Sequence, residues 1–105
     1  MVSWICLIAA GLLEIGWPVG LKMAQQGRMV PGIVIAVFFM TASGLCLYVA
    51  QREIPMGTAY AVWTGLGAAG TFVTGVLLYG DPATALRLLG VALILAGVVT
   101  LKLAH

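Results

Sequence analysis

Charged side chains are scarce in this sequence. The 105 residues include five Lys or Arg, three Asp or Glu and one His, while hydrophobic residues make up 63% of the chain. A soluble domain carries about 25% charged residues to cover its surface, whereas this chain carries 8% and has a mean hydropathy of +1.16. The composition excludes a soluble globular domain and indicates a membrane protein.

Cysteine and basic clusters are also limited. Cys6 and Cys46 both lie inside apolar stretches, where a thiol acts as a small hydrophobic group. Neither forms a spacing typical of a metal site or a disulfide framework. The five basic residues are scattered singly, so they form no patch that would bind nucleic acid. We expect no metal, no cofactor, no nucleic-acid partner and no enzyme activity.

Long apolar stretches occupy most of the chain. They cover residues 4–21, 30–50, 57–79 and 86–103, and the connections between them are short and contain Gly, Pro and charged residues. Each stretch is close to the roughly 20 residues that a helix needs to cross the hydrocarbon of a bilayer. The sequence therefore predicts an all-α membrane protein in which residues 1–105 form a single domain of four transmembrane helices.

The basic residues are nearly balanced between the two ends of these helices. Arg52 and Lys102 lie on the side of the termini, whereas Lys22, Arg28 and Arg87 lie on the opposite side. Orientation in a membrane follows an excess of Lys and Arg near the helix ends. We therefore expect the chain to insert in both orientations, which makes an antiparallel homodimer possible, unless some other factor fixes one orientation.

Glu14 is the only ionisable side chain well inside a predicted span. An ionised carboxylate at the bilayer centre costs at least about 2.5–3.5 kcal/mol, so it must be protonated, paired or exposed to a cavity that holds water. No basic residue lies at a matching depth. One interpretation is a permanently protonated Glu14 that hydrogen-bonds a neighbouring helix. The other is a carboxyl that alternately holds a proton and a cation.

The neighbours of Glu14 favour a binding role. Gly11, Trp17 and Pro18 lie three or four residues away and therefore share its helix face. Pro18 has no N–H to donate to the carbonyl of Glu14, so the helix should be disrupted there and this carbonyl should turn to a new partner. The alternative is a tolerated kink with no role in binding.

Aromatic and hydroxyl side chains recur at a similar depth in the second and third spans. Tyr60 and Trp63 are three residues apart, and Ser43 lies toward the middle of the second span. A carboxylate walled by aromatic faces and hydrogen-bond donors suits a small organic cation. The site is therefore predicted to comprise Glu14 with Gly11, Trp17, Pro18, Ser43, Tyr60 and Trp63.

Glycine marks helix contacts in the last two spans. The third span contains Gly65 and Gly67 among alanines, which predicts a closely packed helix with a hinge. Gly90 and Gly97 are seven residues apart in the fourth span and so lie on one face. Small residues let membrane helices approach closely, and this pair predicts a helix contact in the dimer.

Together these residues resemble the small multidrug resistance family of proton-coupled exporters. The resemblance covers nearly the whole chain and is carried by AGLLE at residues 10–14, Leu21-Lys22, Ser43, PMGTAYAVWTGLG at residues 55–67 and the Gly90/Gly97 pair. Within the family the chain is similar to the guanidinium exporter subtype, because Gly11 and Trp17 accompany Glu14 and Thr58 precedes Ala-Tyr-Ala.

The resemblance implies a multi-pass protein of the bacterial inner membrane that works as an antiparallel homodimer. It would exchange protons for guanidinium or small substituted guanidinyl cations at paired Glu14 carboxylates. Two other functions stay open at this point. The chain could export bulkier quaternary ammonium or hydrophobic cations, or it could be a non-transporting membrane subunit in which Glu14 only makes a helix contact.

Overall fold

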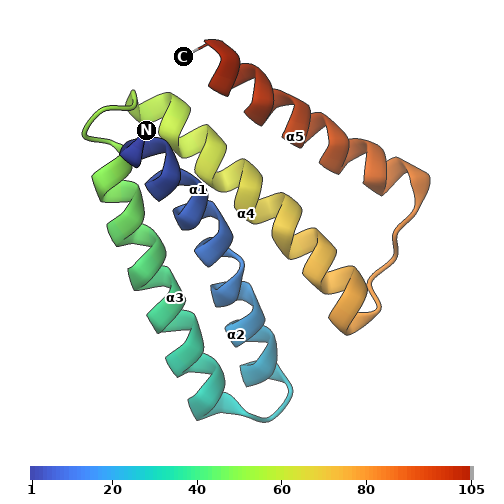
Figure 1. The fold of residues 1–105 in the computed structure, drawn as a ribbon. Helices are drawn as coiled ribbons and strands as arrows, with labels where there is room; N and C mark the ends of the chain where they lie inside the picture. Colours follow the sequence, from blue (N-terminus) through green and yellow to red (C-terminus); the bar gives the residue numbers. More distant parts are fainter. Residues whose placement is uncertain (105) are drawn as a thin grey trace.

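The computed structural model describes residues 1–104, which fold into helices joined by short connections (Figure 1). The helices are α1 (Val2–Glu14), α2 (Gly16–Gln25), α3 (Met29–Ala50), α4 (Met56–Tyr79) and α5 (Ala85–Ala104). Because α1 and α2 together form one span over Val2–Gln25, residues 1–104 contain four helices long and apolar enough to cross a membrane. The predicted all-helical membrane fold is confirmed.

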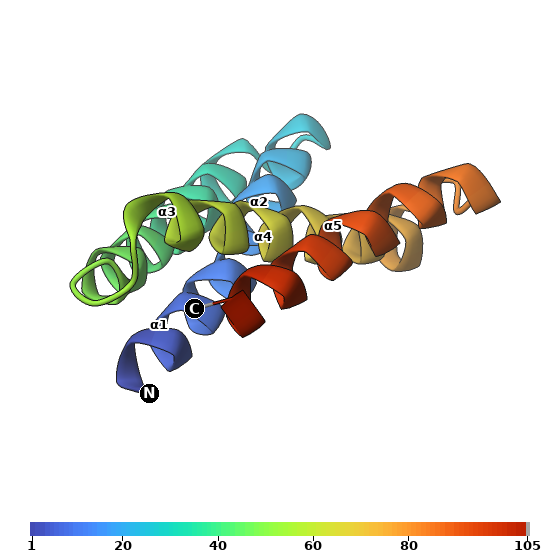
Figure 2. The same ribbon diagram turned by 90° about the horizontal axis from the view of Figure 1, so that it is seen from above.

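The helices lie side by side in a flattened molecule. Across it the order is α3, then α1 with α2, then α4, then α5, and both termini lie at the same end (Figure 1). The Cα atoms extend over 43 × 33 × 17 Å. A view turned by 90° shows α5 again beside α4 and away from α3 (Figure 2). No residue of α5 is buried within the described chain.

The first span is interrupted at Ile15, immediately after Glu14. The Ile15 N–H donates to the carbonyl of Leu12 at 3.2 Å, one residue closer than in a regular α-helix. The interruption precedes Pro18, whose missing N–H removes the hydrogen bond that would otherwise reach the Glu14 carbonyl. The disruption expected from Pro18 is therefore limited to the hydrogen-bond pattern between α1 and α2: Ile15 keeps helical dihedrals, with φ of −62° and ψ of −32°, and the two helices remain parts of one span.

Beyond this interruption α2 is held tightly against α3. A Cβ added to Gly20 would lie 2.6 Å from the backbone N of Ala36 and the carbonyl O of Gly32. Only a glycine lets the two backbones approach this closely. Small residues of this kind are typical of the contacts between membrane helices. Ala36 and Gly32 are buried in this contact. α2 therefore packs along α3.

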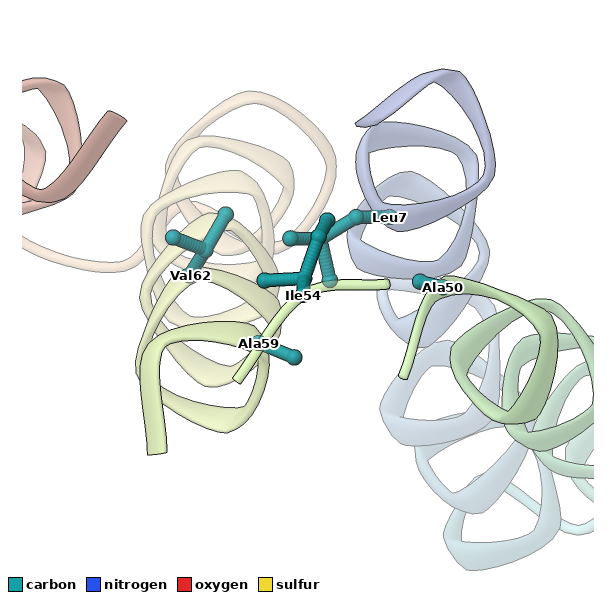
Figure 3. Close-up of a cluster of buried hydrophobic side chains, with 5 residues drawn as sticks. All are labelled: Leu7, Ala50, Ile54, Ala59 and Val62. Carbon is teal, nitrogen blue, oxygen red and sulfur yellow. The ribbon is translucent and has the colours of Figure 1, made fainter. Parts of the chain in front are cut away.

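α4 takes a different direction. It packs against α1 and α5 but makes no extended contact with α2 over residues 16–25. Near the termini, α1, α4 and the end of α3 enclose a core of buried apolar side chains (Figure 3), namely Leu7, Ala50, Ile54, Ala59 and Val62. The packed end thus fixes α4 next to α1, and the divergence of α4 from α2 leaves space at the other end.

Candidate functional site

A large cavity opens where α4 diverges from α2, and Glu14 lies in its wall. Its volume is about 600 Å³, within the range of about 300–1,000 Å³ that is usual for small-molecule sites. Side chains of α1, α2, α3 and α4 contribute to it. The lining residues are Glu14, Trp17, Pro18, Met40, Gly44, Tyr60, Trp63, Thr64, Gly67, Ala68 and Thr71.

The Glu14 side chain is half-buried between its own helix and α4. It is the last residue of α1, and its Cγ would lie 2.7 Å from a Cβ placed on Gly67. The absence of a side chain at Gly67 therefore makes room for the carboxyl. On the other side, the Trp17 indole is within hydrogen-bonding reach of the carboxyl. Glu14 is thus held between a glycine of α4 and an aromatic donor of α2.

A chain of hydrogen bonds fixes Trp63 in the cavity wall. Its indole Nε1 donates to Ser43 Oγ at 2.8 Å, and Ser43 Oγ donates to the carbonyl O of Ala10 at 2.7 Å. Ser43 is fully buried, so the two bonds are shielded from competing water. They connect three helices, α4, α3 and α1, at the depth of the site. The orientation of the Trp63 ring is therefore coupled to the helix that carries Glu14.

Tyr60 lies next to Trp63 on the open side of the cavity. Their ring centroids are 5.3 Å apart and the rings are inclined by 60°, a favourable geometry for an aromatic pair. Tyr60 is 56% exposed. The lining residues Met40, Gly44 and Ala68 are also exposed. The cavity of a single chain is therefore closed on the α1–α2 side and open on the opposite side.

Most of the predicted site residues come together here. Glu14, Trp17, Pro18, Tyr60 and Trp63 line the cavity, and Ser43 lies directly behind Trp63. The remaining residue does not line it: a Cβ on Gly11 would meet the Leu66 side chain at 2.7 Å, so Gly11 permits the contact between α1 and α4 instead.

The glycines predicted to act as a hinge or dimer contact have different surroundings. Gly67 lines the cavity, as described above, whereas Gly65 allows α5 to approach, since a Cβ there would lie 2.7 Å from Val98 Cγ2. Space around Gly90 and Gly97 is open, with no atom of the described chain within 4 Å of an added Cβ. Their faces are thus free of intramolecular contacts.

Sequence reasoning missed several lining residues, although a signal for some of them was present. Tyr60, Thr64, Gly67 and Thr71 succeed one another at intervals of four, three and four residues, which places them on one helix face. Extending this pattern from Tyr60 would have found Gly67 and Thr71 as wall residues. Met40 and Gly44 had no comparable signal, because apart from Thr41 and Ser43 the second span is apolar and has no distinct polar face.

The site has the chemistry of an organic-cation site. Its carboxyl supplies a counter-charge and a hydrogen-bond acceptor, and the aromatic rings supply π faces on which a cation is stabilised. A planar guanidinium group is especially suitable, because its parallel N–H groups match the two oxygens of a carboxylate.

Comparison with known proteins agrees with this geometry. Residues 2–94 match the family model described as Small Multidrug Resistance protein. One similar protein is a guanidinium exporter of Yersinia pseudotuberculosis. It is 48% identical over 104 residues, which cover 98% of this chain and 99% of that protein. A guanidinium exporter of Citrobacter freundii is 47% identical over 102 residues, with 97% of each chain covered. The chain described here therefore belongs to the small multidrug resistance family, whose members are multi-pass membrane transporters and not enzymes.

Proposed function

We propose that this protein is a proton-coupled antiporter that exports guanidinium or small substituted guanidinyl cations across the bacterial inner membrane. The observation that carries the proposal is the position of Glu14, half-buried in an aromatic-walled cavity of about 600 Å³ inside a membrane span. The relatives named as guanidinium exporters support the choice of cation. A membrane carboxyl with no basic partner at its depth must be protonated, bind a cation or face water, and an antiporter site uses the first two in turn.

Guanidinium binding uses the groups already described. The Glu14 carboxylate accepts two N–H hydrogen bonds from the cation, and charge-assisted bonds of this two-pronged kind are stronger and more directional than those to a neutral group. The Trp17 indole is within hydrogen-bonding reach of the carboxylate and can donate to one of its oxygens. Trp63, held through Ser43, provides a rigid face. Little side-chain freedom is lost on binding because these groups are fixed before the cation arrives.

Proton coupling follows from the use of one carboxyl for two ligands. A protonated Glu14 has lost the charge that attracts guanidinium, and a bound guanidinium occupies the oxygen that would take up a proton. Binding of either ligand therefore favours release of the other. With a proton gradient directed inward, protons that enter from outside displace the cation outward, and the cation that binds inside displaces protons into the cell.

An antiparallel homodimer would complete the site. The cavity of one chain is open on one side, and a second chain placed there would bring its own Glu14 toward the first. Two carboxyls in one cavity then titrate as a coupled pair. The unoccupied faces of Gly90 and Gly97 on α5 suit a close helix contact between the chains. In such a dimer the two subunits exchange conformations between inward-open and outward-open states, with Gly65 and Gly67 of α4 as the hinge.

Proton release is the experiment that tests this function. Guanidinium added to detergent-purified protein in weak buffer should release protons, and the amount should fall both at low pH, where no cation binds, and at high pH, where no proton remains. In proteoliposomes a pH gradient should drive guanidinium uphill. Glu14→Gln should abolish both signals, with Glu53→Gln as the matched control. If Glu14→Gln still concentrates guanidinium, the mechanism is wrong. If the unmodified protein neither binds cations nor releases protons, a non-transporting subunit becomes the better explanation.

The size of the cavity supports a second candidate, the export of bulkier quaternary ammonium or hydrophobic cations. About 600 Å³ is more than guanidinium alone fills, and the flexible Met40 side chain lies at the open side. Quaternary cations have no N–H to donate and depend on the aromatic faces. Competition between guanidinium and tetraalkylammonium for proton release separates the two, since a guanidinium-selective site keeps its guanidinium signal in excess quaternary amine.

A further inference from the structure

A second, smaller cavity adjoins the main one along the same gap between α2 and α4. Its volume is about 120 Å³. Pro18 and Thr71 line both cavities, so the two spaces are neighbours with a shared wall. From Thr71 the smaller cavity extends along α4 past Thr74 to Tyr79 and Asp81, a distance of roughly 12 Å between Thr71 and Tyr79 at about 1.5 Å per residue. It therefore lies between the Glu14 cavity and the end of the span.

The turn after α4 places the Asp81 carboxyl at this cavity. Gly80 adopts the left-handed conformation, with φ of 67°, and the Asp81 N–H donates to the carbonyl of Gly75 at 3.1 Å. The chain thereby turns back, and the carboxyl lies directly against Gly75, where any side chain would collide with it. Two glycines, one for the turn and one for the contact, thus fix the position of Asp81.

A cationic side chain, Lys22, is part of the wall of this cavity. Lys22 Nζ lies 5.5 Å from the centroid of the Tyr79 ring, and both residues line the space together with Asp81. The wall of the smaller cavity therefore combines a carboxylate with an aromatic face, as the wall of the main cavity combines Glu14 with its aromatic neighbours. The ammonium group sits on a flexible stem, so it can withdraw when another cation arrives.

Charge makes Asp81 conspicuous at this end of the molecule. Lys22, Arg28 and Arg87 all lie in or beside the connections on this side, whereas Asp81 is the only acidic residue there. The basic residues repel an approaching cation. A single carboxylate at the mouth of the gap counteracts this repulsion locally, where the path to Glu14 begins.

We propose that the smaller cavity is an outer cation site, in which Asp81 and Tyr79 receive a small planar cation of the guanidinium class before it reaches Glu14 or after it leaves. This inference rests on the proposed function, because it needs a cation that travels along the gap. Thr71 and Thr74 line the smaller cavity between the two sites, and the Thr74 hydroxyl donates to the carbonyl O of Gly70 at 2.9 Å. In an antiparallel dimer each membrane face would carry one such site, so entry and exit would use the same residues.

The test is guanidinium uptake into proteoliposomes at low and high ionic strength. Asp81→Asn keeps the size of the side chain and the backbone bond of the turn but removes the charge. We expect its uptake rate at guanidinium concentrations far below saturation to fall by about threefold to tenfold at low salt, and the deficit should largely disappear at about 1 M salt, where charges are screened beyond about 3 Å. The maximal rate at saturation and the equilibrium affinity at Glu14, measured by proton release, should be unchanged.

Two further variants keep the result specific to this site. Asp81→Glu retains the charge and should restore most of the rate. Glu53→Gln removes the acid of the second connection, whose Oε1 accepts a hydrogen bond from Ser3 at 2.8 Å, and should leave uptake unchanged. Equal rates for Asp81→Asn and the unmodified protein at low salt, or an equal loss in Glu53→Gln, would overturn the outer site while leaving guanidinium export intact. An unmodified protein that moves no guanidinium would overturn both proposals.

Discussion

Substitution of Gly67 by alanine tests whether the fit of Glu14 against α4 determines cation affinity. The added Cβ would lie 2.7 Å from Glu14 Cγ and 3.1 Å from its Cβ, whereas carbon atoms prefer about 3.5–4.0 Å. The Glu14 side chain must therefore move by about 0.5–1 Å, because the helix backbones on both sides are fixed by packing. A shift of this size misaligns one of the two hydrogen bonds to guanidinium.

The size of the effect follows from the loss of that bond. A hydrogen bond to a charged group contributes about 1.5–3 kcal/mol, so guanidinium should bind about 10- to 100-fold more weakly. Isothermal titration calorimetry on detergent-purified protein measures this directly. Gly44→Ala is the matched control, because Gly44 also lines the cavity but has no atom of the described chain within 4 Å of an added Cβ.

Two results would refute this reasoning. Gly67→Ala could bind guanidinium as tightly as the unmodified protein, or Gly44→Ala could lose as much affinity as Gly67→Ala. The same variant also separates the two roles assigned to Gly67. If Gly67→Ala binds guanidinium normally but transports it slowly, Gly67 acts as a hinge and does not determine the position of the Glu14 carboxyl.

Two further variants test the packing around the site. Ser43→Ala removes the hydrogen-bond partner of Trp63 and should destabilise the protein by about 1–3 kcal/mol, measured as a lower midpoint of thermal unfolding in detergent, and should weaken guanidinium binding. Ser43→Thr keeps the hydroxyl and should lose less stability. Unchanged stability in Ser43→Ala would contradict the role of the bond. Gly20→Ala places a methyl group against the backbone of Ala36 and should lower the free energy of unfolding by at least about 1–3 kcal/mol. Gly57→Ala is the control, because the space around Gly57 is open, and this variant should fold normally. Equal yields of folded protein for the two variants would show that α2 and α3 can separate at little cost.

The sequence was sufficient to predict the helical spans and to single out Glu14, which lines the candidate site. The spans are predictable because the thickness of the hydrocarbon layer sets their length. Glu14 is predictable because a carboxyl inside lipid is energetically unfavourable and therefore needs an explanation. Tyr60 and Trp63 followed from helical spacing. Pro18 predicted that the first span would be disrupted, although its missing hydrogen bond did not say that the interruption would fall at Ile15.

Other features depend on how the helices are oriented, which no local pattern specifies. Gly11 shares a helix face with Glu14 but contacts Leu66 instead of the cavity, because α1 presents a broad face to α4. Gly67 seats the Glu14 side chain, a role that requires the register of α1 against α4. Asp81 drew no attention in the sequence, since its position depends on the turn at Gly80 and the contact with Gly75.

The interruption at Ile15 lies between two helices with different neighbours. α1 packs against both α3 and α4, whereas α2 packs against α3, where Gly20 lets the two backbones meet. The first span and α3 therefore form one body, and α4 is joined to this body mainly along α1. A change in the width of the gap beside α2 would thus come from α4, while Glu14, the last residue of α1, stays where the two parts remain in contact.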